Sequence, residues 1–286
     1  MRSTRARLAY LGLFATVAST AWAGEVRFQE RIPLAAVGSF SLRSEAGRVT
    51  VRGGDAAEAT ITITSERDDF AKLFAVRIEK SQPNRVEVVV EHKSRPPFSW
   101  FQASFHSRTL VEVTLPRGVA ADVESSGGGI EISNLAGAVR ADSSGGGVHA
   151  VDLGGSAVLS SSGGSVKAEN VAGDLAASSS GGGVHIQEAG GAVAADSSGG
   201  SVSVSFAAGN ARGGSLDSSG GGVKARVDPS VGLEIDASSS GGSVHCDIPL
   251  ATRGRIDRDS LRGKLNGGGA LLKLRSSGGG VTLAER

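Results

Sequence analysis

One tetrapeptide, Ser-Ser-Gly-Gly, recurs through the second half of the chain at nearly constant intervals. Its eight copies begin at Ser125, Ser143, Ser161, Ser179, Ser197, Ser218, Ser239 and Ser276. The first five copies follow one another at steps of 18, the next two at steps of 21, and the last at a step of 37. A period of this length predicts a solenoid, in which each repeat buries its apolar face only against its neighbours.

Apolar residues occupy the same places in successive repeats and are therefore expected to form columns. One predicted inward column contains Ile130, Val148, Val166, Val184 and Val202, continued by Val223, Val244 and Val281. A second column, on the opposite side of the coil, contains Val139, Ala157, Leu175 and Val193. Polar residues that alternate with the first column are predicted to point outward, among them Glu131, His149, Lys167, His185 and Ser203. This period of two indicates strands with one buried face.

The number of strands in each coil follows from the spacing of the apolar positions. Val148, Ala157 and Val166 follow one another at steps of nine. A left-handed hexapeptide helix has a coil of the same length, but its apolar positions recur at steps of six, which excludes it. We therefore predict an all-β fold, a parallel two-sided β-solenoid of the β-helix or β-roll type with 18-residue coils.

Glycine is concentrated where the predicted coils turn. The motif glycines form the first corner, and the glycines expected to stack at the second corner are Gly137, Gly155, Gly173, Gly191 and Gly209. We expect glycine here because a reversal of the chain requires positive φ. The serine beside it is expected to bond to nearby backbone or to the serine of the next coil.

The composition excludes several classes of protein. Glycine accounts for 43 of 286 residues, but not at every third position, which excludes collagen. Only 21% of residues are charged and the glycines are in register, which speaks against disorder. A single cysteine excludes a disulfide framework within the chain, and a net charge of +1 does not favour nucleic acid as a partner.

The segment 1–23 has the layout of a cleavable secretory signal peptide. Arg2, Arg5 and Arg7 precede the apolar run 8–17, and Ala21-Trp22-Ala23 ends the segment before Gly24. The apolar run is shorter than the ~20 residues that a membrane-spanning helix needs. We therefore expect cleavage after Ala23, no transmembrane segment in the mature chain, and export to the periplasm, the cell surface or the medium.

Residues 24–117 contain alternating runs without the repeat period of the second half. The predicted strands are 25–28, 39–42, 48–51, 60–64, 76–78, 85–90 and 110–115. No linker separates this region from the first motif. We therefore expect an irregular, strand-rich N-terminal part over 24–117, continuous with the repeat solenoid over 118–286 and able to cap its open end.

The order of these features resembles the bacterial "putative adhesin" family of β-strand-repeat domains of unknown function. The resemblance rests on the strand 47–53, on the strand 111–116 that ends in Leu-Pro, on the Ser-Ser-Gly-Gly corners, and on the segments 263–269 and 275–281. It covers about Val26 to Leu283. The resemblance implies an exported or surface-associated β-solenoid and supplies no catalytic residues.

The sequence offers no catalytic or nucleotide-binding motif. There is no Gly-x-Ser-x-Gly elbow, and the serines are explained by the corners. The segment 145–150 formally matches the dinucleotide-binding motif Gly-x-Gly-x-x-Ala. No helix is expected after it, so we do not predict a dinucleotide-binding site there. We predict a non-enzymatic protein with no catalytic residues and no cofactor.

Metal binding is the more serious alternative, because calcium-binding β-rolls also use nine-residue halves. Here the position of the β-roll aspartate holds no acid, and Asp142 and Asp196 are separated by two coils that carry serine. His149 and His185 share an outward column two coils apart, roughly 10 Å, which is too far to share one zinc ion. Cys246 falls on an inward column and is predicted to be a small core residue.

One segment breaks the pattern by concentrating aromatic residues. It contains Phe98, Trp100, Phe101 and Phe105. These residues either fold onto the first sheet or form an exposed contact for a partner. Our leading functional hypothesis is an exported structural or adhesion-type protein with a protein or glycan partner at the cell envelope. The alternatives are a carbohydrate-binding or carbohydrate-active β-helix and a calcium-binding β-roll.

Overall fold

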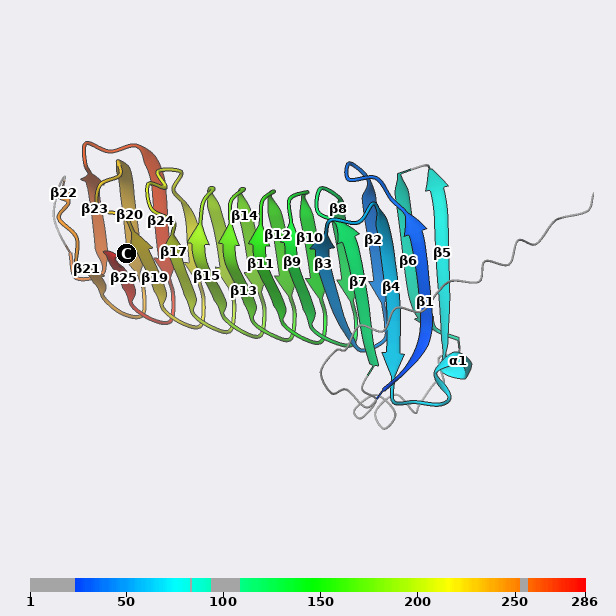
Figure 1. Cartoon of the computed structure of the whole chain (residues 1–286). Coiled ribbons are helices and arrows are strands. Elements are labelled where there is room, and N and C mark those ends of the chain that lie inside the picture. Colours follow the sequence, from blue (N-terminus) through cyan, green and yellow to red (C-terminus); the bar gives the residue numbers. More distant parts are fainter. Residues whose placement is uncertain (1–23, 83, 94–108, 253–256) are drawn as a thin grey trace, which may run out of the picture.

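The computed structural model describes residues 24–82, 84–93, 109–252 and 257–286. They form two β-sheets, and the strands of each sheet follow one another along the same long axis (Figure 1). In the order in which they pair, the strands of the first sheet, sheet A, are β1 (Glu25–Pro33), β4 (Glu58–Ser65), β7 (Thr109–Pro116), β3 (Arg48–Gly54), β9 (Ile130–Leu135), β11 (Val148–Leu153), β13 (Val166–Val171), β15 (Val184–Ala189), β17 (Val202–Phe206), β19 (Val223–Val227), β25 (Val281–Glu285) and β21 (Val244–Cys246).

The second sheet, sheet B, contains the other strand of each coil. Its strands, in the same sense along the stack, are β5 (Phe74–Gln82), β6 (Arg85–His92), β2 (Ser39–Ser44), β8 (Ala120–Ser125), β10 (Val139–Ser143), β12 (Ala157–Ser161), β14 (Leu175–Ser179), β16 (Val193–Ser197), β18 (Gly214–Ser218), β24 (Ala270–Ser276), β20 (Leu233–Ser239), β23 (Ser260–Leu265) and β22 (Ala251–Thr252).

The predicted coil is confirmed in its period and its number of sides. Val148, Val166 and Val184 are direct partners in the parallel ladder of sheet A, and Ala157 and Leu175 are partners in sheet B. Each regular coil therefore contributes one strand to each sheet. The coils rise by the ~4.8 Å spacing of hydrogen-bonded strands.

The interior is aliphatic, as the period of two predicted. Val166 and Ala168 are completely buried, and Val184 is only 1% exposed. Lys167 and His185 lie between these positions in the sequence and face away from the core. Burying each fully enclosed valine contributes about 1.5–3 kcal/mol, so stability accumulates along the stack of coils.

The motif serines tie neighbouring coils together through the backbone. The first serine of every motif is buried. From Ser143 onward, each hydroxyl donates to a glycine carbonyl of the adjacent coil, as Ser179 Oγ does to Gly164 at 2.8 Å. The same oxygen accepts a hydrogen bond from the glycine N–H three residues later, at 3.0 Å from Gly182. Of the two expected bonding modes, backbone bonding is the one observed.

The expected reason for glycine at the motif corner is wrong. None of Gly145, Gly146 and Gly147 has positive φ. Glycine is required there because coils approach closely: a Cβ on Gly146 would lie 2.3 Å from the backbone nitrogen of Gly129. Positive φ occurs instead beside the second corner, at one position in four successive coils, where it is 54–58° at Asn134, Asp152, Asn170 and Glu188.

Gly209 does not belong to the second glycine column, contrary to expectation. It has a φ of 72°, and a Cβ added to it would meet nothing within 4 Å. The longer step between motifs places extra residues in this loop. The next residue, Asn210, is buried, and its side-chain amide donates to the carbonyl oxygens of Ala189 and Gly191 at 2.6 and 2.9 Å.

The order of coils in space departs from their order in sequence at both ends. The C-terminal coil, β24 and β25, lies between the β18–β19 coil and the β20–β21 coil, so the column runs Val223, Val281, Val244. Sequence order alone places Val281 last, which is wrong. At the other end, the coil of β2 and β3 lies between β6–β7 and β8–β9.

Antiparallel strands flank the parallel stack at each end. β4 pairs antiparallel with β7, β1 with β4, and β5 with β6, while β23 pairs antiparallel with β20. All seven strands expected before residue 117 are present. The four-residue helix α1 (Phe70–Leu73), between β4 and β5, was not predicted. Among the described residues, no helix has the length and apolar character needed to span a bilayer.

Candidate interaction groove

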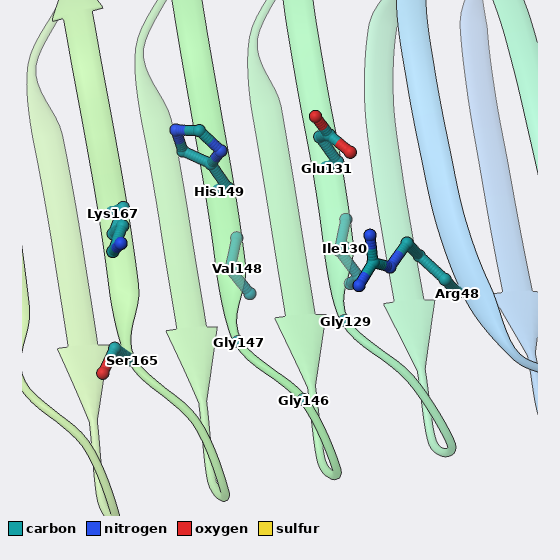
Figure 2. Close-up of a pocket in the computed structure, with 10 residues that line it drawn as sticks. All are labelled: Arg48, Gly129, Ile130, Glu131, Gly146, Gly147, Val148, His149, Ser165 and Lys167. Carbon is teal, nitrogen blue, oxygen red and sulfur yellow. The ribbon is translucent and has the colours of Figure 1, made fainter. Parts of the chain in front are cut away.

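Two hollows lie end to end on the outer face of sheet A, and we call them together the sheet A groove. The first crosses β3, β9, β11 and β13 and is lined by Arg48, Glu131, His149, Ser165 and Lys167, with glycine backbone between them (Figure 2). The second crosses β15, β17 and β19 and is lined by His185, Gln187, Glu188, Ser203, Ser205 and Arg226. Lys167 of the first hollow and His185 of the second are ladder partners on β13 and β15, so the two hollows adjoin there.

The strand register determines which side chains line this groove. Glu131, His149, Lys167 and His185 are ladder partners on successive strands, so they form one outward row. Arg48 is the first residue of β3 and precedes Val49, where the pairing of β3 with β9 begins. The same position holds glycine or serine in later coils. The long side chain of Arg48 consequently reaches over Gly129 and Ile130 at the end of the row (Figure 2).

Several cations of this face have no partner within the described part of the chain. Arg48, Lys167, Lys224 and Arg226 form no ion pair and no side-chain hydrogen bond there. Lys167 and Lys224 belong to the same outward row, and Arg226 lies two residues further along β19.

Three acids of the same face lie close to other side chains. Both carboxylate oxygens of Glu188 accept a hydrogen bond from Arg286 Nη2 at 2.7 Å. Asp152 accepts a 2.6 Å hydrogen bond from the side-chain amide of Asn170. Glu169 lies 3.5 Å from His149 Nε2. These three acids lie toward the second corner, as Arg226 does, whereas Glu131 shares the outward row of Lys167 and has no ion pair or side-chain hydrogen bond among the described residues.

The two histidines of the row behave as predicted. His149 and His185 both face outward with Lys167 between them, which keeps them two coils apart. His185 Nε2 lies 2.8 Å from the side-chain amide nitrogen of Gln187. No group of three or more His, Cys, Asp or Glu side chains suited to a metal ion occurs among the described residues.

Sheet B has a different outer face. A third hollow there crosses β2, β8, β10 and β12, where Arg43 pairs with Glu124 at 3.0 Å. Asp142 and Asp196 share a column, with Ser160 and Ser178 between them as expected.

Further along this column, Asp196 and Asp217 are direct ladder partners on β16 and β18. Partial burial, together with the Asp217 carboxylate, raises the pKa of Asp196. Two carboxylates therefore face each other across neighbouring strands.

Two further sequence-based predictions concern residues outside the groove. Cys246 is half-buried against the core on β21, as predicted, and its Sγ donates to the carbonyl of Ile248 at 3.3 Å. Burial raises the pKa of the Cys246 thiol. The aromatic candidates Phe98, Trp100, Phe101 and Phe105 lie outside the described residues, as does the leader 1–23.

Sequence reasoning placed the outward row but missed the groove as a site. Arg48 was missed because it lies outside the repeat period. Arg226 was missed because only the folded structure shows that no side chain of the described chain pairs with it. A useful signal was present in the sequence, since Lys167 and Lys224 fall in one column with His149 and His185.

Solved structures that match this chain come from several bacteria. The chain is 11% identical to "a putative cell adhesion protein" from Clostridium sporogenes, covering 92% of this chain and 100% of that one, with a TM-score of 0.34. It is 12% identical to "a putative adhesin" from Bacteroides fragilis, covering 91% and 96%, with a TM-score of 0.41. A third, from Parabacteroides merdae, is 12% identical, covering 90% and 95%, with a TM-score of 0.37.

No curated protein matches the sequence significantly. The model of one family, described as Toastrack DUF4097, matches residues 37–284. This match spans both the non-periodic strands and the Ser-Ser-Gly-Gly coils, and it confirms the expected resemblance to a β-strand-repeat family of unknown function. The chain is therefore a member of the Toastrack DUF4097 family.

Proposed function

We propose that this protein is an exported, non-enzymatic β-solenoid that presents a stiff outer surface for adhesion-type contact with a partner at the cell envelope. The observation that carries the proposal is the fixed register of outward side chains. Glu131, His149, Lys167 and His185 stand on successive hydrogen-bonded strands. Such a row offers many similar contacts at ~4.8 Å intervals along one line.

Rigidity makes these contacts useful. Sheet A has 12 strands in the described part of the chain, so its eleven steps span roughly 50 Å. Interior coils are bonded to neighbours on both sides, through the sheet ladders and through the buried serines. Contacts made by a preorganised surface lose little conformational entropy on binding, and weak contacts on one rigid body add in avidity.

The export component rests on the sequence of the segment 1–23. Its basic start, apolar run and Ala-Trp-Ala end have the layout that secretion machinery recognises. In this proposal residues 24–117 and 118–286 remain as one continuous mature body. Its destination is the periplasm, the cell surface or the medium.

Cell fractionation with N-terminal sequencing tests the export component. The mature protein should begin at Gly24, and protease treatment of intact cells should then separate surface exposure from a periplasmic location. A cytoplasmic product that keeps residues 1–23 would overturn it.

Binding of the purified mature chain to isolated cell envelopes tests the contact component. We expect saturable sedimentation with the envelopes and no turnover in hydrolase screens. Absence of envelope binding, or steady turnover of a substrate, would overturn this part.

A further inference from the structure

We propose that the sheet A groove binds a linear, negatively charged polysaccharide laid along the long axis of the solenoid. This inference rests on the proposed function, because it names the chemistry of the partner. It assigns the contact with the acidic groups of the polymer to Arg48, Lys167 and Arg226, which line the groove, and to Lys224, which stands beside the groove in the same outward row as Lys167.

The shape of the groove favours a long ligand. The two hollows cross seven successive strands from β3 to β19, so six strand spacings give a length of roughly 29 Å. Each hollow crosses successive strands of the stack, and side chains of the outward row are part of its lining. A small molecule would leave most of such a surface unused, whereas a linear polymer with repeating units matches a row of repeating side chains.

Charge favours an acidic ligand. Lys167 and Lys224 stand in an outward row whose other members from β9 to β19 are Glu131, two histidines and a serine, and Arg48 covers the end of the row beside Glu131. Of the two acids that line the groove, Glu188 is paired with Arg286 and Glu131 has no ion pair among the described residues, so the three lining cations exceed the unpaired acids. Carboxylate or sulfate groups on a ligand would supply the missing counter-charges in charge-assisted hydrogen bonds.

The chemistry of the groove favours a sugar over a peptide. The strands that form its floor already pair on both sides, so a peptide cannot add to the sheet as a further strand. Ser165, Ser203, Ser205 and Gln187 supply hydroxyl and amide groups suited to sugar hydroxyls. The lining includes only Ile130, Val148 and Ile186 as apolar residues, and all three are buried in the core, so no pocket is available for an apolar anchor.

A single-stranded nucleic acid is also a linear polyanion, but this groove does not suit it. Recognition of single strands combines a basic groove with aromatic side chains on which bases stack. Neither hollow is lined by Phe, Tyr or Trp from the described residues. Binding of nucleic acid is therefore treated as an outcome that the test must distinguish.

The test uses the full mature chain, with polygalacturonate as the acidic probe and amylose as the neutral one. Calorimetry should detect binding of polygalacturonate that weakens as sodium chloride is raised, and no binding of amylose. The double variant Lys167→Gln/Arg226→Gln should lower the affinity about tenfold or more, because it removes two charged contacts. Both side chains are exposed, so the melting temperature should stay unchanged.

A matched control lies on the opposite face. Lys273→Gln/Arg140→Gln removes the same number of charges from sheet B and should leave the affinity for polygalacturonate unchanged. An equal loss in both double variants, no binding of the acidic polymer, or equally tight binding of oligo(dT) would each overturn the proposal. Envelope binding that persists in the Lys167→Gln/Arg226→Gln variant would overturn this groove assignment alone and leave the proposed function standing.

Discussion

Ser161 Oγ donates a 2.8 Å hydrogen bond to the carbonyl oxygen of Gly146, which belongs to the preceding coil. The same hydroxyl oxygen accepts a 2.9 Å hydrogen bond from the N–H of Gly164 in its own corner. Ser161 is only 3% exposed, so water does not replace either bond readily. One small side chain thus satisfies two partly buried backbone groups and joins two coils.

Replacing Ser161 by alanine should therefore destabilise the protein by about 1–3 kcal/mol, because two partly buried backbone groups lose their partner. The matched control is Ser162→Ala, one residue further along the same motif, where the side chain is exposed. We expect the control to change the free energy of unfolding by less than ~0.5 kcal/mol. Urea denaturation measures both, and equal losses would show that the hydroxyl of Ser161 is not the cause.

Gly146→Ala tests the close approach of coils. The added Cβ would lie 2.3 Å from the backbone nitrogen of Gly129, so backbone must move, at a cost of about 1–3 kcal/mol. In Gly54→Ala the nearest atom is a side-chain methyl of Thr114 at 3.2 Å, which can shift. Thermal melts should show a clearly larger loss for Gly146→Ala. A loss of equal size in both variants would contradict the packing explanation.

Deleting one whole coil should be tolerated better than placing one charge in the core. Removing residues 162–179 joins Ser161 to Ser180 and preserves the motif and the register of every column. Val166→Asp buries an unpaired carboxylate at a completely buried position, at a cost of several kcal/mol. The coil deletion loses only one repeat and one interface. A lower melting temperature for the deletion than for Val166→Asp would contradict this prediction.

The regular coils could be predicted because their information is local and repeated. Val184 and His185 show this, because the alternation of apolar and polar residues alone predicts that Val184 faces inward. The nine-residue spacing of apolar positions predicts that the coil has two sides. Each repeat tests the same assignment again. Burial of Val184 at 1% exposure confirms it.

The order of the last coils could not be predicted in the same way. Val244 and Val281 follow identical motifs, and either could pair chemically with Val223. Their true order depends on the connection through β22 and β23, which carries no repeat. The groove could not be predicted for a similar reason. Whether Arg226 has a partner in the described chain depends on which side chains lie beside it in space, and the sequence does not give these neighbours.

The role of the aromatic segment can be tested by mutation. If Trp100 and Phe101 pack onto the first sheet, the double variant Trp100→Ala/Phe101→Ala should lose roughly 3 kcal/mol or more of stability. If they form an exposed contact, the melting temperature should hold while binding to cell envelopes is lost. Circular dichroism and envelope sedimentation on the same protein distinguish the two outcomes. A variant with unchanged stability and unchanged binding would rule out both roles.

Asp196 provides a prediction about pH, because partial burial and the neighbouring Asp217 carboxylate raise its pKa in the folded state. A raised carboxyl pKa means that the folded protein holds the proton more tightly than the unfolded chain does, so stability falls as pH rises through this window. Asp196→Asn should therefore stabilise the protein at pH 7, by roughly 0.5 kcal/mol as for other like-charged cross-strand pairs.

The gain from Asp196→Asn should disappear below the pKa of the unfolded side chain, near pH ~3.9, where the carboxyl group is neutral in both states. Asp217→Asn should give a similar gain at pH 7, and the double variant should gain less than the sum, because either substitution alone removes the repulsion. Thermal melts of the four proteins at pH 3.5 and pH 7 measure this coupling. Additive gains that persist at pH 3.5 would show that the two carboxylates do not repel each other across β16 and β18.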